Sequence, residues 1–324
     1  MADEQQPHGA APQRENWERD VIRKLAEAAL SEQRKARRWG ILFKSLTFVY
    51  LFALLFIALG WIGSREGVTA GKHTAMVTLS GVIDSDGPAS ADNVTAGLQD
   101  AFDDKNTQGV ILRINSPGGS PVQADAINGE IRRLRSKHPE TPLYAVVDDI
   151  CASGGYYVAV AADRIFVSKA SIVGSVGVLM DGFGFTGTME KLGIERRLLT
   201  AGENKGFLDP FSPMEAKQKQ YAQRMLGEIH QQFVQVVREG RGKRLKEDGD
   251  TFSGLVWTGE RSIELGLADA LGDTAYVARE VIKAEKIVDF TPRENLAERF
   301  AKRFGAATAE ALVRLGGVSA PRVR

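Results

Sequence analysis

The sequence predicts an α/β protein, with a parallel sheet buried between helical layers, preceded by one transmembrane helix. From Ala75 onward, short apolar runs alternate with helical patterns, and this alternation is typical of parallel α/β sheets. A continuous apolar run at residues 41–62 has about the ~20 residues that a bilayer-spanning helix needs. The 324 residues are enough for that helix and one large globular domain.

The apolar run is expected to be an uncleaved anchor. Trp39 and Trp61 bracket it, as in the aromatic belts of membrane helices. Four basic residues lie just before it, whereas only Arg65 and Lys72 follow closely. The positive-inside rule therefore predicts a cytoplasmic N-terminus, with the remaining domain across the membrane. A signal peptide is disfavoured, because forty residues precede the run and no A-x-A site follows.

These patterns divide the chain into consecutive segments. We expect a cytoplasmic segment at 1–40, the anchor at 41–63, a polar linker at 64–74, the globular domain at 75–288 and a helical tail at 289–324. Within the domain, the predicted strands are 75–79, 109–114, 143–147, 164–168, 177–180 and 194–199, and the predicted helices are 91–103, 121–136, 154–162 and 213–239, with further helix in 259–284.

Composition excludes several classes of function. The 42 Lys and Arg residues are balanced by 41 Asp and Glu, so no basic excess indicates nucleic acid. The single cysteine, Cys151, excludes an intrachain disulfide and a zinc site with several thiolates. The motif GVTAGKH is one residue short of a P-loop, and His73 replaces its Ser or Thr. We expect no cofactor, no metal and no dependence on ATP.

Two glycine-rich turns are candidates for chemistry. The loop NSPGGS at 115–120 follows a predicted strand, where its exposed amides would suit an anion or oxyanion. Ser153 lies between another predicted strand and a small-residue helix, where the free amides favour a developing negative charge. The alternatives are an ordinary strand-to-helix turn for the loop and a helix N-cap for Ser153.

A base for Ser153 is not obvious among the four histidines. His8 falls on the cytoplasmic side, and none of the others occupies a strand end or a glycine-rich loop. The alternative base is a lysine kept neutral by burial. Lys205, in the Gly- and Pro-rich segment TAGENKGFLDPF, is the best candidate, although an exposed loop lysine has the same pattern. Ser175, in GSVGV, lies in a turn from which it can steady such a base.

Taken in order, NSPGG, ASGGYY, GSVGV, the loop lysine and VWTGERSIELGLADALG (256–272) resemble the signal peptide peptidase A family of bacterial membrane serine proteases. The resemblance covers residues 75–282. It implies that Ser153 is the nucleophile, Lys205 the base and Ser175 the residue that orients the lysine, with oxyanion amides at Gly119 and Gly154. Unlike the doubled bacterial form, this chain must supply both dyad residues from a single repeat.

The same resemblance implies further properties of the protein. The fold expected for 75–288 is the ββα spiral of the Clp protease and crotonase group, assembled as a ring- or dome-like homo-oligomer, an octamer by resemblance. The implied location is a bacterial inner membrane, with the protease domain on the periplasmic side. The implied substrates are remnant signal peptides and other hydrophobic, membrane-associated peptides.

Three other interpretations remain open from the sequence. A crotonase-like hydratase or thioesterase would use acidic residues, and Asp148 and Asp149 would be its carboxylates. The GFGFTG motif at 182–187 has the glycine spacing of a dinucleotide-binding loop, but no acidic residue ends the following segment. The third is a membrane scaffold that has lost catalysis, against which the joint presence of Ser153 and Lys205 argues.

Overall fold

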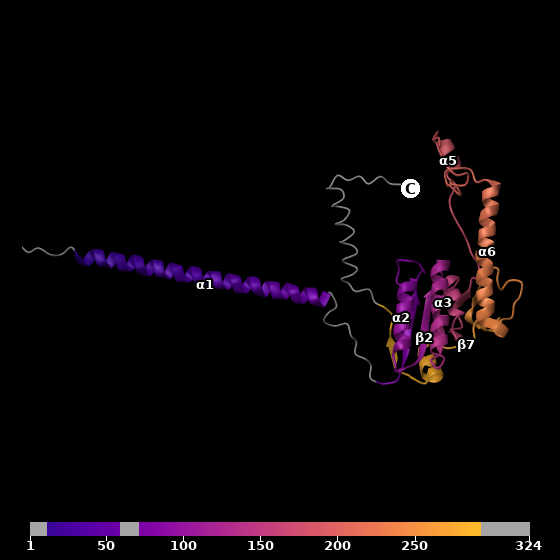
Figure 1. The fold of residues 1–324 in the computed structure, drawn as a ribbon, viewed down its shortest axis with the longest axis horizontal. Coiled ribbons are helices and arrows are strands. Elements are labelled where there is room, and N and C mark those ends of the chain that lie inside the picture. The colour runs from indigo at the N-terminus through magenta and orange to yellow at the C-terminus, as the bar shows by residue number, and fades with distance from the viewer. Residues whose placement is uncertain (1–11, 59–70, 293–324) are drawn as a thin grey trace, which may run out of the picture. The chain divides into compact units, whose positions relative to one another are not determined.

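The structure is a computed structural model that describes residues 12–58 and 71–292 (Figure 1). These residues belong to two separate units, helix α1 and the domain formed by residues 71–292. The predicted segments at 1–11, 59–70 and 293–324, which include most of the linker and of the C-terminal tail, lie outside the described residues.

Helix α1 (Pro12–Ala58) runs without interruption through the predicted cytoplasmic segment and into the predicted anchor. Among the described residues, one helix is long and apolar enough to cross a membrane, with its candidate span inside Val21–Leu55. Apolar side chains of this span are exposed, including Phe48 at 69% and Val49 at 68%. Exposed apolar surface of this extent on a single helix fits association with a membrane.

The domain contains a mixed β-sheet, and helices connect its strands along the chain. This architecture confirms the predicted α/β class. The strands are β1 (His73–Ser80), β2 (Thr107–Ser116), β3 (Leu143–Ala152), β4 (Arg164–Val167), β5 (Ile172–Gly174), β6 (Val256–Thr258), β7 (Ala270–Leu271) and β8 (Ile287–Asp289). The main order is β6-β5-β3-β2-β1-β8, and β4 pairs with both β3 and β7. All pairs are parallel except β5 with β6.

The helices of the domain are α2 (Ala91–Asp103), α3 (Pro121–Lys137), α4 (Gly154–Ala159), α5 (Thr186–Lys191), α6 (Ala216–Arg241), α7 (Gly259–Glu264) and α8 (Thr274–Tyr276), with a 3-10 turn η1 (Gly242–Arg244) and a π-helical turn η2 (Val277–Ile282). Serine side chains cap two of them: Ser90 accepts from the Asn93 amide, and Ser120 accepts from the Gln123 amide. Each cap satisfies an amide that the first turn leaves unpaired.

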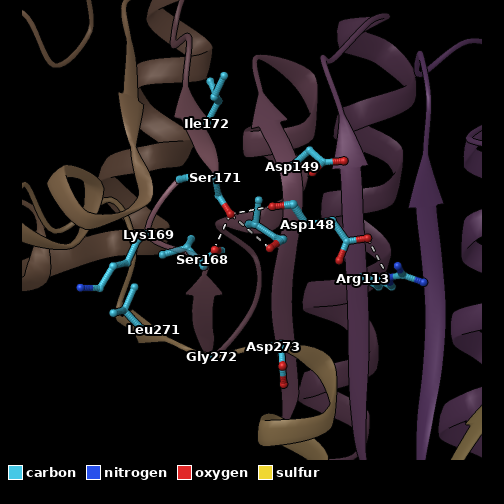
Figure 2. A pocket seen from close by; sticks show the side chains of 13 residues that line it. Arg113, Asp148, Asp149, Ser168, Lys169, Ser171, Ile172, Leu271, Gly272 and Asp273 are labelled. Carbon is cyan, nitrogen blue, oxygen red and sulfur yellow. Dashed lines mark hydrogen bonds and ion pairs between the residues drawn. The ribbon is translucent and has the colours of Figure 1, made fainter.

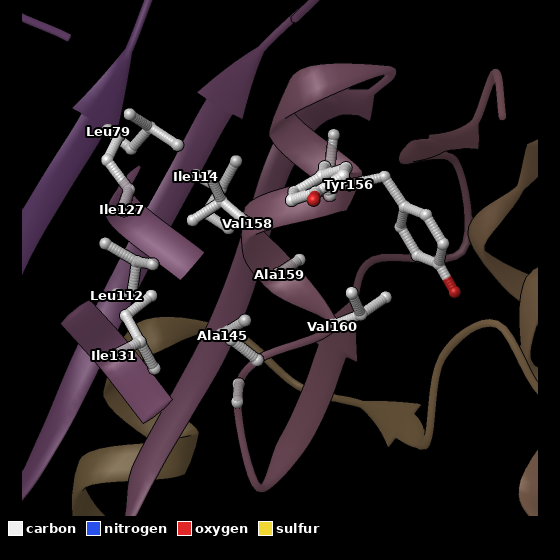
Figure 3. Close-up of a cluster of buried hydrophobic side chains, with 14 of the residues drawn as sticks. Leu79, Leu112, Ile114, Ile127, Ile131, Ala145, Tyr156, Val158, Ala159 and Val160 are labelled. Carbon is white, nitrogen blue, oxygen red and sulfur yellow. The ribbon is translucent and has the colours of Figure 1, made fainter. Parts of the chain in front are cut away.

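The main core lies between the sheet and helices α2, α3 and α4. Figure 3 shows Leu112 and Ile114 of β2 beside Ile127 of α3 and Tyr156 of α4, and all four are buried. Burying one such side chain contributes about 1.5–3 kcal/mol. The Tyr156 hydroxyl donates to the carbonyl of Leu267 at 2.8 Å, so its polar atom is satisfied. This core fixes α4, the helix that directly follows the Ser153 turn, against β2 and β3.

A buried ion pair attaches the end of α6 to the sheet. The Arg241 guanidinium donates to both oxygens of Asp269, at 2.8 and 2.9 Å, and to the carbonyl of Gly266 at 2.7 Å. Asp269 also accepts from the Ile165 amide at the start of β4. Burial alone would raise the pKa of Asp269, but the hydrogen bonds and charge of Arg241 outweigh it and hold that pKa below its usual value.

Two predicted strands are wrong. Residues 177–180 and 194–199 are not in strands, and the strand in this region is β5, which ends at Gly174. Residues 178–215, here called the arm, contain only the short helix α5, and in Figure 1 α5 lies beyond the N-terminal end of α6, away from the strands. An apolar run becomes a strand only where a neighbouring strand satisfies its backbone, and the described residues offer none here.

The arm is held together mainly by its own contacts. The rings of Phe185 and Phe211 stack at 5.4 Å, and the Phe185 amide donates to the Pro210 carbonyl at 2.8 Å. Leu179 and Phe183 are each 80% exposed and Leu199 is 96% exposed. The arm therefore presents apolar side chains to its surroundings rather than to the core of its own domain.

Candidate active site

Ser153 lies where β3 ends and α4 begins. Its backbone has φ 50° and ψ −123°, a left-handed conformation that is unfavourable for a residue with a side chain. The hydroxyl makes no capping hydrogen bond to α4, so the N-cap interpretation does not account for its side chain. The Ser153 amide donates to the Gly174 carbonyl at 2.9 Å, and the Ser153 carbonyl accepts from the Tyr157 amide at 2.9 Å. These bonds hold a strained, half-buried serine at the end of the strand.

The loop at 115–120 lies directly against this turn. A Cβ added to Gly118 would meet the Ser153 Cβ and the Gly154 nitrogen, each at 2.7 Å. A Cβ added to Gly154 would lie 3.3 Å from the Gly119 nitrogen. The amides of Gly119 and Gly154 are therefore neighbours, and within residues 71–292 neither donates a hydrogen bond. Two adjacent free amides beside a serine are the arrangement that stabilises an oxyanion.

The segment before α2 supports this loop. The Ile83 amide donates to the Gly118 carbonyl at 2.9 Å, and the Ser120 amide donates to the Ile83 carbonyl at 2.8 Å. Gly119 has φ 150°, and a Cβ there would lie 2.1 Å from the Ile83 carbonyl oxygen. Only glycine therefore fits at residue 119, and its contact with Ile83 fixes where the loop amides lie.

Ser175 lies beside Ser153 because β5 is parallel to β3. Ala152 pairs with Gly174, so the two serines are the next residues along their strands. Ser175 also has a left-handed backbone, with φ 53°, and its amide donates to the Leu255 carbonyl at 2.8 Å. The structure therefore brings together Ser153, Ser175, Gly119 and Gly154 from three separate segments of the chain.

Lys205 is not part of this group in the single chain. It lies in a turn of the arm, where its amide donates to the Gly202 carbonyl at 3.1 Å. Its side chain is exposed, and no contact joins it to Ser153 among the described residues. Phe207 and Leu208 are only half-buried themselves, so the burial expected to keep the lysine neutral is not supplied within one chain.

The described histidines do not contact Ser153. His73 is buried in β1 and stacks on Phe290, and His138 ends α3 beside Phe102. His230 lies on α6, and its Nε2 donates to the carbonyl of Val176, the residue after Ser175. The sequence does not indicate this contact, because a histidine inside a long helix carries no signal of which loop it will meet.

Cys151 is also excluded from nucleophilic chemistry. It is fully buried, and burial raises the pKa of its thiol far above the ordinary range. A thiol is a nucleophile only as the thiolate. Although Cys151 lies two residues before Ser153, it belongs to the core of the sheet.

Asp148 and Asp149 line a different cavity, shown in Figure 2. Asp148 forms an ion pair with Arg113 at 2.7 Å, and Asp149 accepts from the Asn115 side chain at 3.1 Å. The cavity has a volume of about 790 Å³, and neither Ser153 nor the amides of its glycine neighbours line it. Both carboxylates thus have partners, as expected for a charged pair on a strand.

Two other possibilities find no support in the described residues. The GFGFTG motif at 182–187 lies in the arm, eight or so positions after β5 ends, so it lacks the strand–loop–helix context of a dinucleotide site. No group of three or more His, Cys, Asp or Glu side chains suited to a metal ion is found in the part of the chain that the structure describes.

Comparisons with known proteins find one family model and several relatives that are similar to the chain. Residues 135–288 match the model of peptidase family S49. A putative protease of Methanocaldococcus jannaschii is 33% identical over 203 residues, covering 61% of this chain and 64% of that protein. The putative signal peptide peptidase SppA of Enterococcus faecium is 27% identical over 235 residues, covering 70% of this chain and 67% of that protein.

A third relative has a different name. The Na(+)/H(+) antiporter NhaA of Brucella melitensis is 46% identical over 180 residues, covering 55% of this chain but 24% of that protein. The chain thus spans about a quarter of this relative and just under two thirds of the archaeal protease. The antiporter's name describes a protein that is largely unmatched here. The match to the family model and the similarity to the two peptidases support an assignment to peptidase family S49, the signal peptide peptidase A family.

Proposed function

We propose that the chain is a membrane-anchored, ATP-independent serine endopeptidase with a dyad of Ser153 and Lys205. The observation that carries the proposal is the strained turn at Ser153, with the free amides of Gly119 and Gly154 beside it. The match of residues 135–288 to the peptidase S49 model supports the same reaction class. The finer fold, a ββα spiral of the Clp protease and crotonase group, is part of this proposal.

The proposed reaction has two steps. The Ser153 hydroxyl attacks the substrate carbonyl carbon, and the neutral Lys205 amine takes the hydroxyl proton. The Gly119 and Gly154 amides donate to the oxyanion that forms, an interaction worth about 2.7–4 kcal/mol per donor. The protonated lysine then gives its proton to the departing amine, which leaves an acyl-serine. Water, deprotonated by the same lysine, attacks the acyl group; the bond to the Ser153 oxygen breaks, that oxygen takes the proton back from the lysine, and the second product is released as a carboxylic acid.

This mechanism requires Lys205 to approach Ser153 and to be shielded from water. The arm that carries Lys205 is exposed and displays apolar side chains such as Leu199 and Phe183, which a protein–protein contact would bury. We therefore include homo-oligomerisation in the proposal, with an octamer expected from the family resemblance. Assembly is then the step that brings a Lys205 amine to Ser153 and covers it.

The proposed substrates are remnant signal peptides and other hydrophobic, membrane-associated peptides. The apolar helix α1 supports a location at the membrane where such peptides accumulate. The proposed orientation has the N-terminus in the cytoplasm and the protease domain on the periplasmic side of a bacterial inner membrane. A reporter that works only in the cytoplasm, fused to the C-terminus, should be silent, and a signal from it would overturn the orientation.

The test of the proposed chemistry is labelling with a serine-reactive fluorophosphonate. The full-length protein in detergent should be labelled at one residue, and Ser153→Ala should remove that label together with peptide hydrolysis. Ser136→Ala, at an exposed serine on α3, is the matched control and should keep both. Label or turnover that persists in folded Ser153→Ala would show that the nucleophile is another residue.

A further inference from the structure

His230 joins the long helix α6 to the loop that follows β5. Its Nε2 lies 3.2 Å from the carbonyl oxygen of Val176, a contact between residues 54 positions apart. A carbonyl oxygen only accepts hydrogen bonds, so the imidazole proton is on Nε2. Val176 is fully buried and directly follows Ser175. The contact is therefore made one residue from the serine expected to orient Lys205.

The loop at Ser175 has few other attachments. The Ser175 amide donates to the Leu255 carbonyl, and the Val176 side chain belongs to the main core. From Val178 onward the chain enters the arm. Among the described residues, no further hydrogen bond holds the chain until Phe185 bonds to Pro210 within the arm itself. His230 is thus the last hydrogen-bonding attachment before the arm leaves the domain.

The same face of α6 also contacts the turn at Ser153. Phe233, one helical turn after His230, lies 5.2 Å from the ring of Tyr157 on α4. The Tyr157 amide in turn donates to the Ser153 carbonyl at 2.9 Å. Helix α6 therefore contacts residues beside both serines: Tyr157, which bonds to Ser153, through Phe233, and Val176, which follows Ser175, through His230.

We propose that His230 is a positioning residue for the peptidase reaction. By donating to the Val176 carbonyl, the His230 imidazole fixes the position of Ser175 relative to Ser153. The same bond sets the direction in which the arm, which carries Lys205, leaves the domain. His230 does not act as the base, because it contacts neither the nucleophile nor a reacting atom. The inference rests on the proposed function and assigns to it a residue outside the Ser-Lys dyad.

The test compares His230→Leu, which keeps volume but loses the donor, with Gln231→Leu at the exposed neighbouring position on α6. Hydrolysis of an internally quenched apolar peptide is measured with the full-length protein in detergent. His230→Leu should lower kcat about tenfold with little change in KM, since misplacing a catalytic group is costly. His230→Gln, which keeps an N–H donor, should retain most of kcat, and Gln231→Leu should match the wild type.

A double-mutant cycle identifies the residue through which His230 acts. If it positions Ser175, His230→Leu should have much less effect in a Ser175→Ala background. Any of three results would overturn the inference. These are equal effects of His230→Leu in the two backgrounds, an unchanged kcat for His230→Leu, and a folded His230→Gln that is as impaired as His230→Leu. Should His230→Leu fail to fold, the cycle is run with His230→Glu, which has no donor, against His230→Gln. Turnover by Ser153→Ala would instead overturn the proposed function, so the two failures are distinguishable.

Discussion

The amide of Ser153 donates to the carbonyl of Gly174 at 2.9 Å, and this bond continues the pairing of β3 with β5 past the end of both strands. It places Ser153 next to Ser175, and both residues have φ near 50°, at 50° and 53°. Two adjacent non-glycine residues with left-handed backbones are costly, at about 1–3 kcal/mol each. Such strain persists where the surrounding structure enforces it, as it does at many catalytic turns.

The strain at Ser153 predicts an order of stability among its variants. The free energy of unfolding of Ser153→Gly should be about 1 kcal/mol higher than that of Ser153→Ala, because glycine adopts this conformation without steric cost. Both variants should be inactive, since each lacks the hydroxyl. Thermal unfolding in detergent measures the difference, expected as a few degrees in Tm. Equal stability of the two variants would show that the turn is not strained.

Replacement of Gly119 should damage both the fold of the loop and catalysis. In Gly119→Ala the new methyl group would lie 2.1 Å from the Ile83 carbonyl oxygen, so the loop must move. We expect a loss of about 1–3 kcal/mol in stability and, with a proposed oxyanion donor displaced, a kcat lower by about 10²–10³. Gly129→Ala on α3 is the control: its new methyl meets nothing within 4 Å, and helix propensity predicts a gain of about 0.5–1 kcal/mol.

Lys205 should be essential for turnover and dispensable for folding. Because its side chain is exposed, Lys205→Ala should keep the wild-type melting temperature while kcat falls by about 10²–10⁴, the range for loss of a general base. Lys205→Arg should be nearly as inactive, since arginine remains charged and cannot take the serine proton. Lys191→Ala, another exposed lysine of the arm, should hydrolyse peptide normally. Near wild-type kcat in Lys205→Ala would remove the lysine from the mechanism.

The buried pair of Arg241 and Asp269 should be important for stability. Asp269→Asn leaves the fully buried guanidinium without its counter-charge, which costs about 3–5 kcal/mol. Glu264→Gln, which breaks the exposed pair with Arg261, should change stability by less than about 1 kcal/mol. Urea unfolding of the two variants in detergent measures both effects, and equal losses would show that burial does not strengthen the Arg241 pair.

The same pair predicts how stability changes with pH. The pKa of Asp269 is lowered in the folded protein, because Arg241 outweighs the opposing effect of burial. As the solution is acidified, Asp269 therefore takes up a proton at a higher pH in the unfolded chain than in the folded protein. The stability that the pair contributes is lost as the pH falls from the ordinary aspartate pKa toward the lowered pKa of the folded protein. Urea midpoints measured between pH 7 and pH 3 should fall less steeply for Asp269→Asn than for the wild type.

The sequence predicted the strands with strong apolar runs and missed those that depend on pairing. The runs at 109–114 and 143–147 lie inside β2 and β3. By contrast, β7 contains only Ala270 and Leu271, and it is a strand because β4 lies beside it. Residues 194–199 also end in two apolar residues, Leu198 and Leu199, but no strand lies beside them in the part of the chain that the structure describes, so they form none. Short strands are set by tertiary contacts, which a local pattern does not contain.

The residues of the candidate site also differ in how far the sequence predicts them. The motifs located Ser153, Ser175 and the glycine loop, because strand ends and glycines are visible in the sequence, and the structure brings these residues together. Whether Lys205 is buried depends on where the arm lies, which no local pattern specifies. The contact of His230 with Val176 joins a helix to a distant loop, and helical periodicity alone gives no reason to select that histidine.

The position of Lys205 on an exposed arm has a consequence for the life of a newly made chain. A lone copy holds Ser153, the proposed nucleophile, at the end of β3 and Lys205 in the arm, with no contact between them among the described residues. Under the proposed assembly, such a copy is latent and cannot digest its neighbours during synthesis and membrane insertion. Proteolysis would then begin only above a threshold density of copies in the membrane, so the expression level would set when the proposed peptidase becomes active.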